Sequence, residues 1–247
     1  MRRLPLVCLA VLVSHAAPFS ATAQPVERPM ISVNGAFQPT NHPFNDRLTF
    51  DVNRETGTTS ARYPGEAGLV IDAGLSVGVW RNLGVGVAVS RVAADQVATT
   101  ESDVPHPFFF NTPRQVVGEV TGLRRTELAV HADLVYRLPV GRAIRVALFA
   151  GPSFMQVEQD TITSIEYDES FPFDTATFRG AQQRRSSGSG VTFNAGADVA
   201  WMFTRHIGVG GIARFAEADF DLDLGDARNQ RISAGGFSGG GGLRFVF

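Results

Sequence analysis

The sequence predicts an all-β fold, a single up-and-down barrel of eight antiparallel strands. Eight segments alternate apolar and polar residues with the period of two that a half-buried strand requires. The connections between these segments alternate between a few residues and long polar stretches. The eighth segment runs to the last residue, and an even number of strands lets the last strand pair with the first and close the sheet.

The expected strands cover residues 31–38, 69–79, 83–90, 127–137, 144–155, 191–203, 207–217 and 231–247. Short turns follow the second, fourth and sixth strands, and long polar loops follow the others. This rhythm places all short turns at one end of a barrel and all long loops at the other, which a Greek-key sandwich does not do. Strands of roughly 9 to 11 residues also match a tilted crossing of a lipid bilayer. We therefore expect a transmembrane barrel with short periplasmic turns and long extracellular loops.

The last strand has one apolar and one polar face. Phe237, Leu243, Phe245 and Phe247 share a face, and Ser238, Gly240, Gly242 and Arg244 share the other. Read backwards from the end, Phe247, Phe245 and Gly242 resemble the terminal assembly signal of bacterial outer-membrane β-barrels. An ordinary last strand of a soluble β-sandwich is the alternative interpretation of this stretch.

Residues 24–247 as a whole resemble the small eight-stranded outer-membrane barrels of the OmpA and OmpX type, the outer membrane protein β-barrel domain family. The resemblance implies a Gram-negative cell envelope protein located in the bacterial outer membrane. It also implies two partners, the outer-membrane lipid and the barrel-assembly machinery, which would read Gly242, Phe245 and Phe247. We expect a monomer.

The N-terminus has the layout of a cleaved secretory signal peptide over residues 1–23. Arg2 and Arg3 precede an apolar run at residues 4–13, and small residues at 21–23 form the cleavage site. A short segment, 24–29, would then precede the barrel at 30–247. Cys8 is the single cysteine and lies in the signal peptide, so the mature chain is expected to have no disulfide and no thiolate metal site.

Charge and histidine positions argue against other classes of function. Removing Arg2 and Arg3 from 22 basic residues leaves 20 against 24 acids, a net charge of −4, which gives no basic field for nucleic acid. His42, His106 and His206 stand at unrelated spacings, so we expect no metal site and no cofactor.

The inward phase of the predicted strands collects charges of both signs. Asp72, Glu127, Asp133 and Asp198 share it with Arg137, Arg145, Arg214 and Arg244. An eight-stranded barrel is just wide enough for side chains to fill it, and buried charges must be paired. We therefore predict a lumen plugged by an arginine–carboxylate network, with a structural or surface-interaction role for the protein. A narrow channel for small or apolar solutes is an alternative.

His131 raises a second alternative, because it lies two residues from Asp133 on the inward face. The lipid A deacylases and palmitoyltransferases are small outer-membrane barrels that use His and Ser. A lipid-modifying enzyme would need His131 and a serine within hydrogen-bond reach at the membrane rim. Ser76 and Ser90 are in phase but lie on other strands, so we interpret His131 as a satisfied lumen residue and expect no catalysis.

The long loops are candidates for binding a surface ligand. Residues 105–110 carry an aromatic run that we expect to fold against the barrel rim, with contact to a partner or lipid as the alternative. Asp219, Asp221 and Asp223 lack the glycine and glutamate of a calcium loop. Their alternation with Phe220, Leu222 and Leu224 predicts a strand that extends beyond the membrane. Its apolar phase differs from that of Phe215, which suggests a bulge near Glu217.

Overall fold

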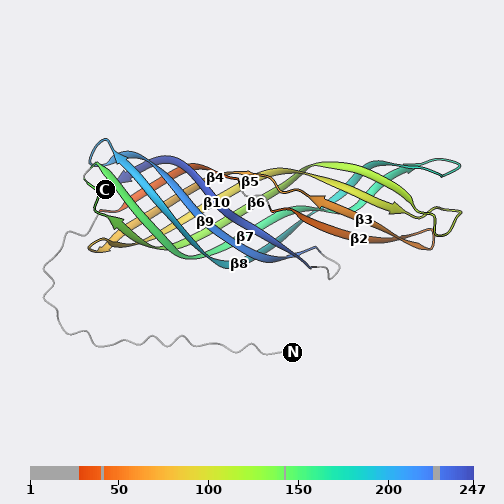
Figure 1. Ribbon diagram of the computed structural model, residues 1–247, viewed down its shortest axis with the longest axis horizontal. Coiled ribbons are helices and arrows are strands. Elements are labelled where there is room, and N and C mark those ends of the chain that lie inside the picture. Colours follow the sequence, from red (N-terminus) through yellow and green to blue (C-terminus); the bar gives the residue numbers. More distant parts are fainter. Residues whose placement is uncertain (1–27, 40–41, 142, 225–228) are drawn as a thin grey trace, which may run out of the picture.

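The computed structural model describes residues 28–39, 42–141, 143–224 and 229–247. The expected signal peptide and residues 24–27 of the segment 24–29 lie outside these ranges. Ten strands form one antiparallel sheet (Figure 1). They are β1 (Met30–Gln38), β2 (Phe44–Val52), β3 (Glu55–Tyr63), β4 (Gly68–Trp80), β5 (Leu83–Val104), β6 (Arg114–Leu138), β7 (Ile144–Glu169), β8 (Ala176–Met202), β9 (Ile207–Asp223) and β10 (Asn229–Val246).

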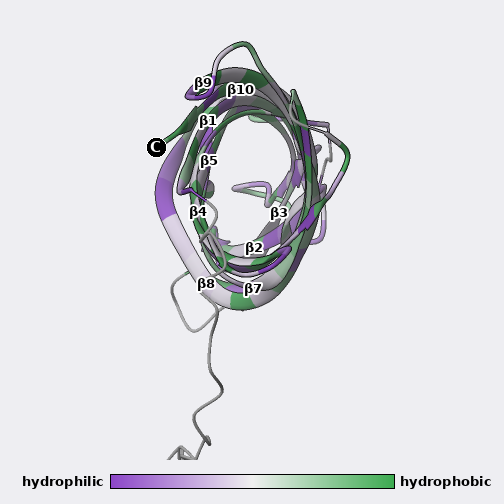
Figure 2. Cartoon of the chain, turned by 90° about the vertical axis from the view of Figure 1, so that its left-hand side faces the viewer, coloured by the Kyte–Doolittle hydropathy of each residue, from purple (hydrophilic) through white to green (hydrophobic). Residues whose placement is uncertain are grey.

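Eight of these strands close into a barrel. β1 pairs with β10 from Met30 opposite Val246 to Phe37 opposite Gly239, and β5 pairs with both β4 and β6. The cycle β1–β4–β5–β6–β7–β8–β9–β10 therefore has no open edge at the level of β1. Figure 2 views the molecule from the short-turn end and shows the strands as a closed ring. The predicted all-β, antiparallel up-and-down barrel is confirmed, but the sheet has ten strands where eight were predicted.

The other two strands form a hairpin where the sequence predicted only a long loop. β2 pairs with β3, and β3 pairs in turn with β5, from Thr58 opposite Asp103 to Arg62 opposite Thr99. Phe44 and Leu48 point inward on β2 and are buried, but the inward position between them is Asp46. This acid interrupts the apolar alternation, which is why the strand pattern was missed.

The predicted strands at the long-loop end are also too short. β5, β6, β7 and β8 contain 22, 25, 26 and 27 residues, at least twice the roughly 9 to 11 residues that cross a bilayer. Most of the predicted long loops after Ser90 and Met155 is therefore continuous strand, and the segments that join the strand tips are short.

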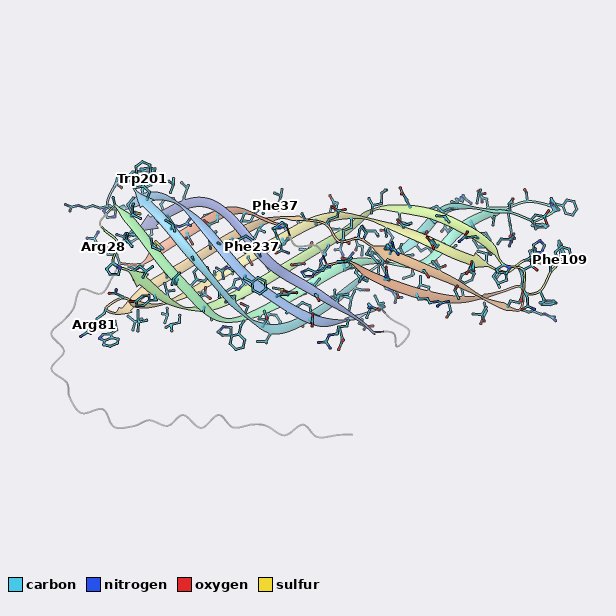
Figure 3. All side chains as sticks on the ribbon, viewed as in Figure 1. Arg28, Phe37, Arg81, Phe109, Trp201 and Phe237 are labelled. Carbon is cyan, nitrogen blue, oxygen red and sulfur yellow. The ribbon has the colours of Figure 1, made fainter. Side chains whose placement is uncertain are left out.

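The barrel divides along its axis into two halves with opposite polarity. We call the half with the short turns the belt half, because its outer face is apolar on every strand. Large apolar side chains exposed there include Phe37, Leu69, Ile71, Val87, Leu128, Leu134, Phe154, Phe193, Trp201, Phe215, Phe237 and Leu243. Such an outward band is typical of a barrel embedded in lipid. Figure 3 shows Trp201 at the short-turn end and Phe37 and Phe237 further along the belt half.

The other half, which we call the head, has its apolar side chains inside. It comprises β2, β3 and residues 90–104, 114–127, 155–169, 176–190, 216–223 and 229–236, with the segments that join them. The largest cluster of buried apolar side chains lies here and includes Phe44, Tyr63, Leu123, Val157, Phe220 and Leu222. Tyr63 stacks on Phe44 with ring centroids 4.2 Å apart, and its hydroxyl accepts a hydrogen bond of 2.8 Å from the backbone N–H of Ile162. The head thus has a core like that of a water-soluble β protein.

The predicted bulge near Glu217 is wrong. β9 and β10 pair without interruption from Asp223 opposite Asn229 through Phe215 opposite Phe237. Phe215 is exposed on the outer face, whereas Phe220 and Leu222 are buried on the inner face. The strand keeps its phase, and the face that carries the apolar residues changes as the strand passes from the belt half into the head.

This division predicts a position-dependent cost for an outward charge. Leu134→Arg, in the belt half, should lower the free energy of unfolding by about 2–4 kcal/mol, because the guanidinium would face hydrocarbon. Val117→Arg, on the outer face of the head, should change it by less than about 0.5 kcal/mol. Denaturant unfolding of each variant folded in phospholipid vesicles measures the difference, and equal losses would contradict the placement of the belt.

Candidate functional site in the barrel interior

Arg244 of β10 anchors one end of a buried polar cluster in the belt half. The side chain is fully buried. Its Nε and Nη2 donate to the two carboxylate oxygens of Asp198 on β8, the first at 3.2 Å. Nη1 donates to Oδ1 of Asn34 on β1 at 2.6 Å, and Nδ2 of Asn34 donates to Oδ1 of Asp72 on β4 at 2.9 Å. One arginine therefore ties together four strands on both sides of the β1–β10 closure.

Arg214 of β9 holds the other end of the cluster. Its guanidinium nitrogens lie 3.5 Å from Oδ2 of Asp72 and 3.5 Å from Oδ2 of Asp133. Nη1 also donates to Oδ1 of Asn194 at 3.1 Å, and Nδ2 of Asn194 donates to Oδ1 of Asp133 at 2.9 Å. The guanidinium carbon lies 4.7 Å from the centroid of the Phe149 ring. Three carboxylates are thus compensated by two arginines and two asparagines.

A second buried pair lies higher in the barrel, at the boundary with the head. Arg125 Nε donates to Oε1 of Glu127 at 2.9 Å, and its Nη2 donates to the carbonyl of Ser233 at 2.9 Å. Oε2 of Glu127 accepts from the backbone N–H of Gly235 at 3.0 Å and from Nε2 of Gln38 at 3.3 Å. Gly235 has a φ of 90°, which favours glycine, so this pair fixes an unusual stretch of β10.

His131 lies between these two layers and contacts two serines. Its Nε2 is 3.0 Å from Oγ of Ser90, and its Nδ1 is 2.7 Å from Oγ of Ser153. Ser76 does not join this group, and its hydroxyl accepts a bond of 3.3 Å from Arg137. A serine is therefore within reach of His131, as an enzyme would require. However, His131 is 1% exposed, and the adjoining cavity measures about 20 Å³, room for little more than one water molecule.

The structure brings together most of the residues that the sequence placed in the lumen. Asp72, Asp133, Asp198, Arg214 and Arg244 form one cluster, Glu127 joins the higher pair and His131 lies between. Arg137 is half-buried. Arg145 departs from the prediction because its side chain is exposed. It is the second residue of β7, and at that end of the barrel the inward-facing side chains are exposed to water.

Four members of the interior were not singled out from the sequence: Asn34, Asn194, Ser153 and Arg125. Both asparagines lie in phase with the charged residues, but their side chains are neutral. Ser153 stands in phase with Phe149 and Arg145 on the same strand, a signal that could have identified it. Arg125 was assigned to a loop because the apolar alternation ends at Leu128. Polar residues in the inward phase of a strand, whether charged or neutral, were the signal that could have identified these interior residues.

In the part of the chain that the structure describes, the interior of the belt half is filled. In the head, a cavity of about 870 Å³ lies beside the β2–β3 hairpin, and Asp46, Ala61 and Leu224 are among the residues that line it. The cavities that adjoin the polar clusters measure about 10, 20 and 50 Å³. Above them, the apolar cluster of the head includes residues of the β2–β3 hairpin. No group of three or more potential ligands that could hold a metal ion occurs among the described residues. The described residues also contain no helix long and apolar enough to cross a membrane.

The three residues of the proposed assembly signal lie at the short-turn end of β10. Gly242 pairs with Asn34 of β1, and a Cβ atom at this position would stand 1.8 Å from the carbonyl oxygen of Val33. Phe245 is half-buried and Phe247 is exposed. Glycine is thus required at 242 by the close approach of β1 alone, whether or not the residue also acts in assembly.

Comparisons with known proteins give weak likenesses to solved outer-membrane proteins. No protein-family model matches the chain, and no curated protein matches its sequence. The outer membrane protein OprG from Pseudomonas aeruginosa is 8% identical with a TM-score of 0.47, over 90% of this chain and 96% of that one. The outer membrane protease OmpT from Escherichia coli is 8% identical with a TM-score of 0.46, over 92% and 99%. Neisserial surface protein A is 10% identical with a TM-score of 0.40, over 91% and 100%. These likenesses assign no role to any residue of this chain.

The Arg244–Asp198 pair predicts a specific pattern of stability changes. Arg244→Met should lower the free energy of unfolding by about 3–5 kcal/mol, because it leaves the Asp198 carboxylate buried and uncompensated. Adding Asp198→Asn should recover most of this loss. Arg145→Met, at the exposed end of β7, is the matched control and should have little effect. Denaturant titration in vesicles measures all three variants, and failure of the double variant to recover would refute the pairing.

Proposed function

We propose that this chain is an integral outer-membrane barrel that holds a rigid, β-built head above the membrane and has a structural or surface-interaction role. One observation carries the proposal: the apolar residues lie outside in the belt half and inside in the head. A barrel immersed in lipid over its lower half and in water over its upper half requires this inversion. A soluble barrel would leave the whole belt of apolar side chains exposed to water.

The orientation follows from the lengths of the connections. Short turns lie at the end that holds both Met30 and Val246, and the long strands extend from the other end. In barrels of this kind short turns face the periplasm, so the head would stand outside the cell. The predicted signal peptide, the predicted assembly signal at Gly242, Phe245 and Phe247, and the resemblance to OmpA and OmpX support the same location in the outer membrane.

A channel is the less favoured alternative, because two separate layers fill the interior. The charged cluster around Arg214 and Arg244 occupies the belt half, and the apolar core around Tyr63 and Leu222 occupies the head. A solute would have to separate buried ion pairs and then enter a packed core. Either barrier is large on the scale of thermal energy.

A lipid-modifying enzyme is disfavoured by the surroundings of His131. The serine–histidine contacts exist, but both ring nitrogens bond to serine hydroxyls and neither bonds to a carboxylate. The adjoining cavity has no room for an acyl chain. We therefore propose that His131 satisfies Ser90 and Ser153 in the packed lumen and has no catalytic role.

Single-channel recording tests the closed lumen. The chain without residues 1–23, refolded in detergent and inserted into a planar bilayer, should show no conductance steps above the bare bilayer. A mobility difference between boiled and unboiled samples on a gel confirms folding. Reproducible conductance steps from the folded protein would contradict a filled interior and would make transport the leading function.

A further inference from the structure

An aromatic cap covers the end of the head that lies farthest from the belt half. Phe108, Phe109, Phe110 and Phe171 are between 60% and 82% exposed. The first three join β5 to β6, and the last joins β7 to β8. Figure 3 shows Phe109 at the extreme end of the molecule. The expectation that the aromatic run folds against the barrel rim is wrong, because the side chains of Phe108, Phe109 and Phe110 are exposed to solvent.

The cap is held in place by buried polar groups. Nδ1 of His106, a residue 4% exposed, accepts hydrogen bonds from the backbone N–H groups of Phe108 and Phe109 at 3.1 and 3.2 Å. Arg114, which is also buried, donates to the carbonyls of Pro105 and Phe173 and pairs with Glu169 at 2.6 Å. The two aromatic segments are therefore fixed to each other, and the exposure of their phenylalanines is built into the fold.

The hairpin β2–β3 supports the same cap from the side. Oε1 of Glu55 accepts a hydrogen bond from the backbone N–H of Asn111 at 2.8 Å, and Nδ2 of Asn53 donates to the carbonyl of Pro105 at 3.2 Å. Phe173 packs edge-on against Phe108 and Phe171, with centroids 5.6 and 6.2 Å away. The apolar surface of the cap thus comes from the two tips that join β5 to β6 and β7 to β8, whereas the β2–β3 tip beside it carries Asn53, Arg54 and Glu55.

The most protruding segments carry no charged residue. Residues 105–113 and 170–173 contain no Asp, Glu, Lys or Arg. Just behind them Arg114 pairs with Glu169 and Arg179 lies 3.6 Å from Asp168, while the exposed carboxylate of Asp174 lies 3.8 Å from His106 Nε2. The phenylalanines of these two segments can therefore enter an apolar phase without an ionised group of their own segment, and the exposed Asp174 beside them disfavours an anionic surface.

The size of the cap favours lipid over a folded protein as its partner. Aromatic side chains bury roughly 150–250 Å² each when fully covered, and these four are 60% to 82% exposed, so together they offer on the order of 500 Å². A standard protein interface needs about 800 Å² on each partner. Insertion into lipid needs no matching surface, and the burial of each phenylalanine ring in hydrocarbon is favourable. A few such side chains are enough for reversible membrane binding.

The position of the cap excludes the membrane that holds the barrel. β6 runs from Leu128 at the top of the belt half to Arg114 beside the cap. At roughly 3.3 Å per residue and a tilt of about 40°, this places the cap on the order of 35 Å from the belt. We propose that the aromatic cap binds the surface of a second, electrically neutral lipid bilayer that faces the first. The inference rests on the proposed function, because the belt half must occupy one membrane.

Vesicle tethering tests this inference. The chain without residues 1–23 is reconstituted into phosphatidylcholine liposomes and mixed with fluorescent, protein-free phosphatidylcholine vesicles. The wild type should retain severalfold more acceptor vesicles than protein-free liposomes do, and F108S/F109S/F110S/F171S should return to that background. V97S/V117S removes apolar side chains exposed on the side of the head and should tether as the wild type does.

A direct insertion measurement keeps the test independent of the quadruple variant. Phe109→Trp in a W80F/W201F background leaves one tryptophan in the chain. Brominated phosphatidylcholine placed only in the acceptor vesicles should quench its fluorescence. Absence of quenching would overturn the proposal. Tethering that requires protein in both vesicle populations would also overturn it, because it would show that two copies of the protein contact each other. Co-flotation of the protein with the liposomes into which it was reconstituted tests separately whether the belt half occupies a membrane. Failure of the proposed function can therefore be distinguished from failure of the cap to bind a second membrane.

Discussion

The structure depends on the closure of the sheet between β1 and β10. Backbone N–H and C=O groups in lipid have no water to bond to, so a sheet that crosses a membrane must have no edge. Once it is closed, each strand presents alternate residues to the lipid and to the lumen. Because the residues that face the lipid are apolar, the polar residues of each strand face the lumen, and the charges among them must be paired. The bonds from Arg244 to Asn34 and Asp198 meet this requirement at the closure itself.

The same alternation gives the opposite arrangement where the strands leave the membrane. Phe215 faces outward, whereas Phe220 and Leu222, further along the same uninterrupted strand, face inward. The environment of the strand changes at the boundary but its phase does not, so β9 needs no bulge there. Long strands with a packed core then make the head rigid. A rigid head is what allows His106 and Arg114 to hold phenylalanines in water at its far end.

The sequence was sufficient for the belt half and insufficient for the head. In the belt half, the outward alternation of Leu, Val and Phe marks each strand, and the phase then assigned Asp72, Asp133, Asp198, Arg214 and Arg244 to the interior. In the head, a polar outer face, short hydroxyl side chains and Asp46 in the inward phase blur that alternation. Arg145 shows a further limit, since phase gives the direction of a side chain but not where the barrel ends.

The central claim is that one set of strands reverses its polarity at a single level, and spin-label accessibility measures this directly. Single cysteines are placed along β6, in a Cys8→Ser background, at outward positions from Leu138 to Leu128 and on both faces from Thr126 to Leu123. These positions stop short of the register shift between Leu123 and Val120. The account predicts that outward labels from Leu138 to Leu128 are accessible to oxygen dissolved in the lipid, and that outward labels beyond Leu128 are accessible to a water-soluble relaxation agent. Inward labels beyond Leu128 should be inaccessible to that agent. Water accessibility of outward labels throughout β6, or a change of phase at the boundary, would contradict it.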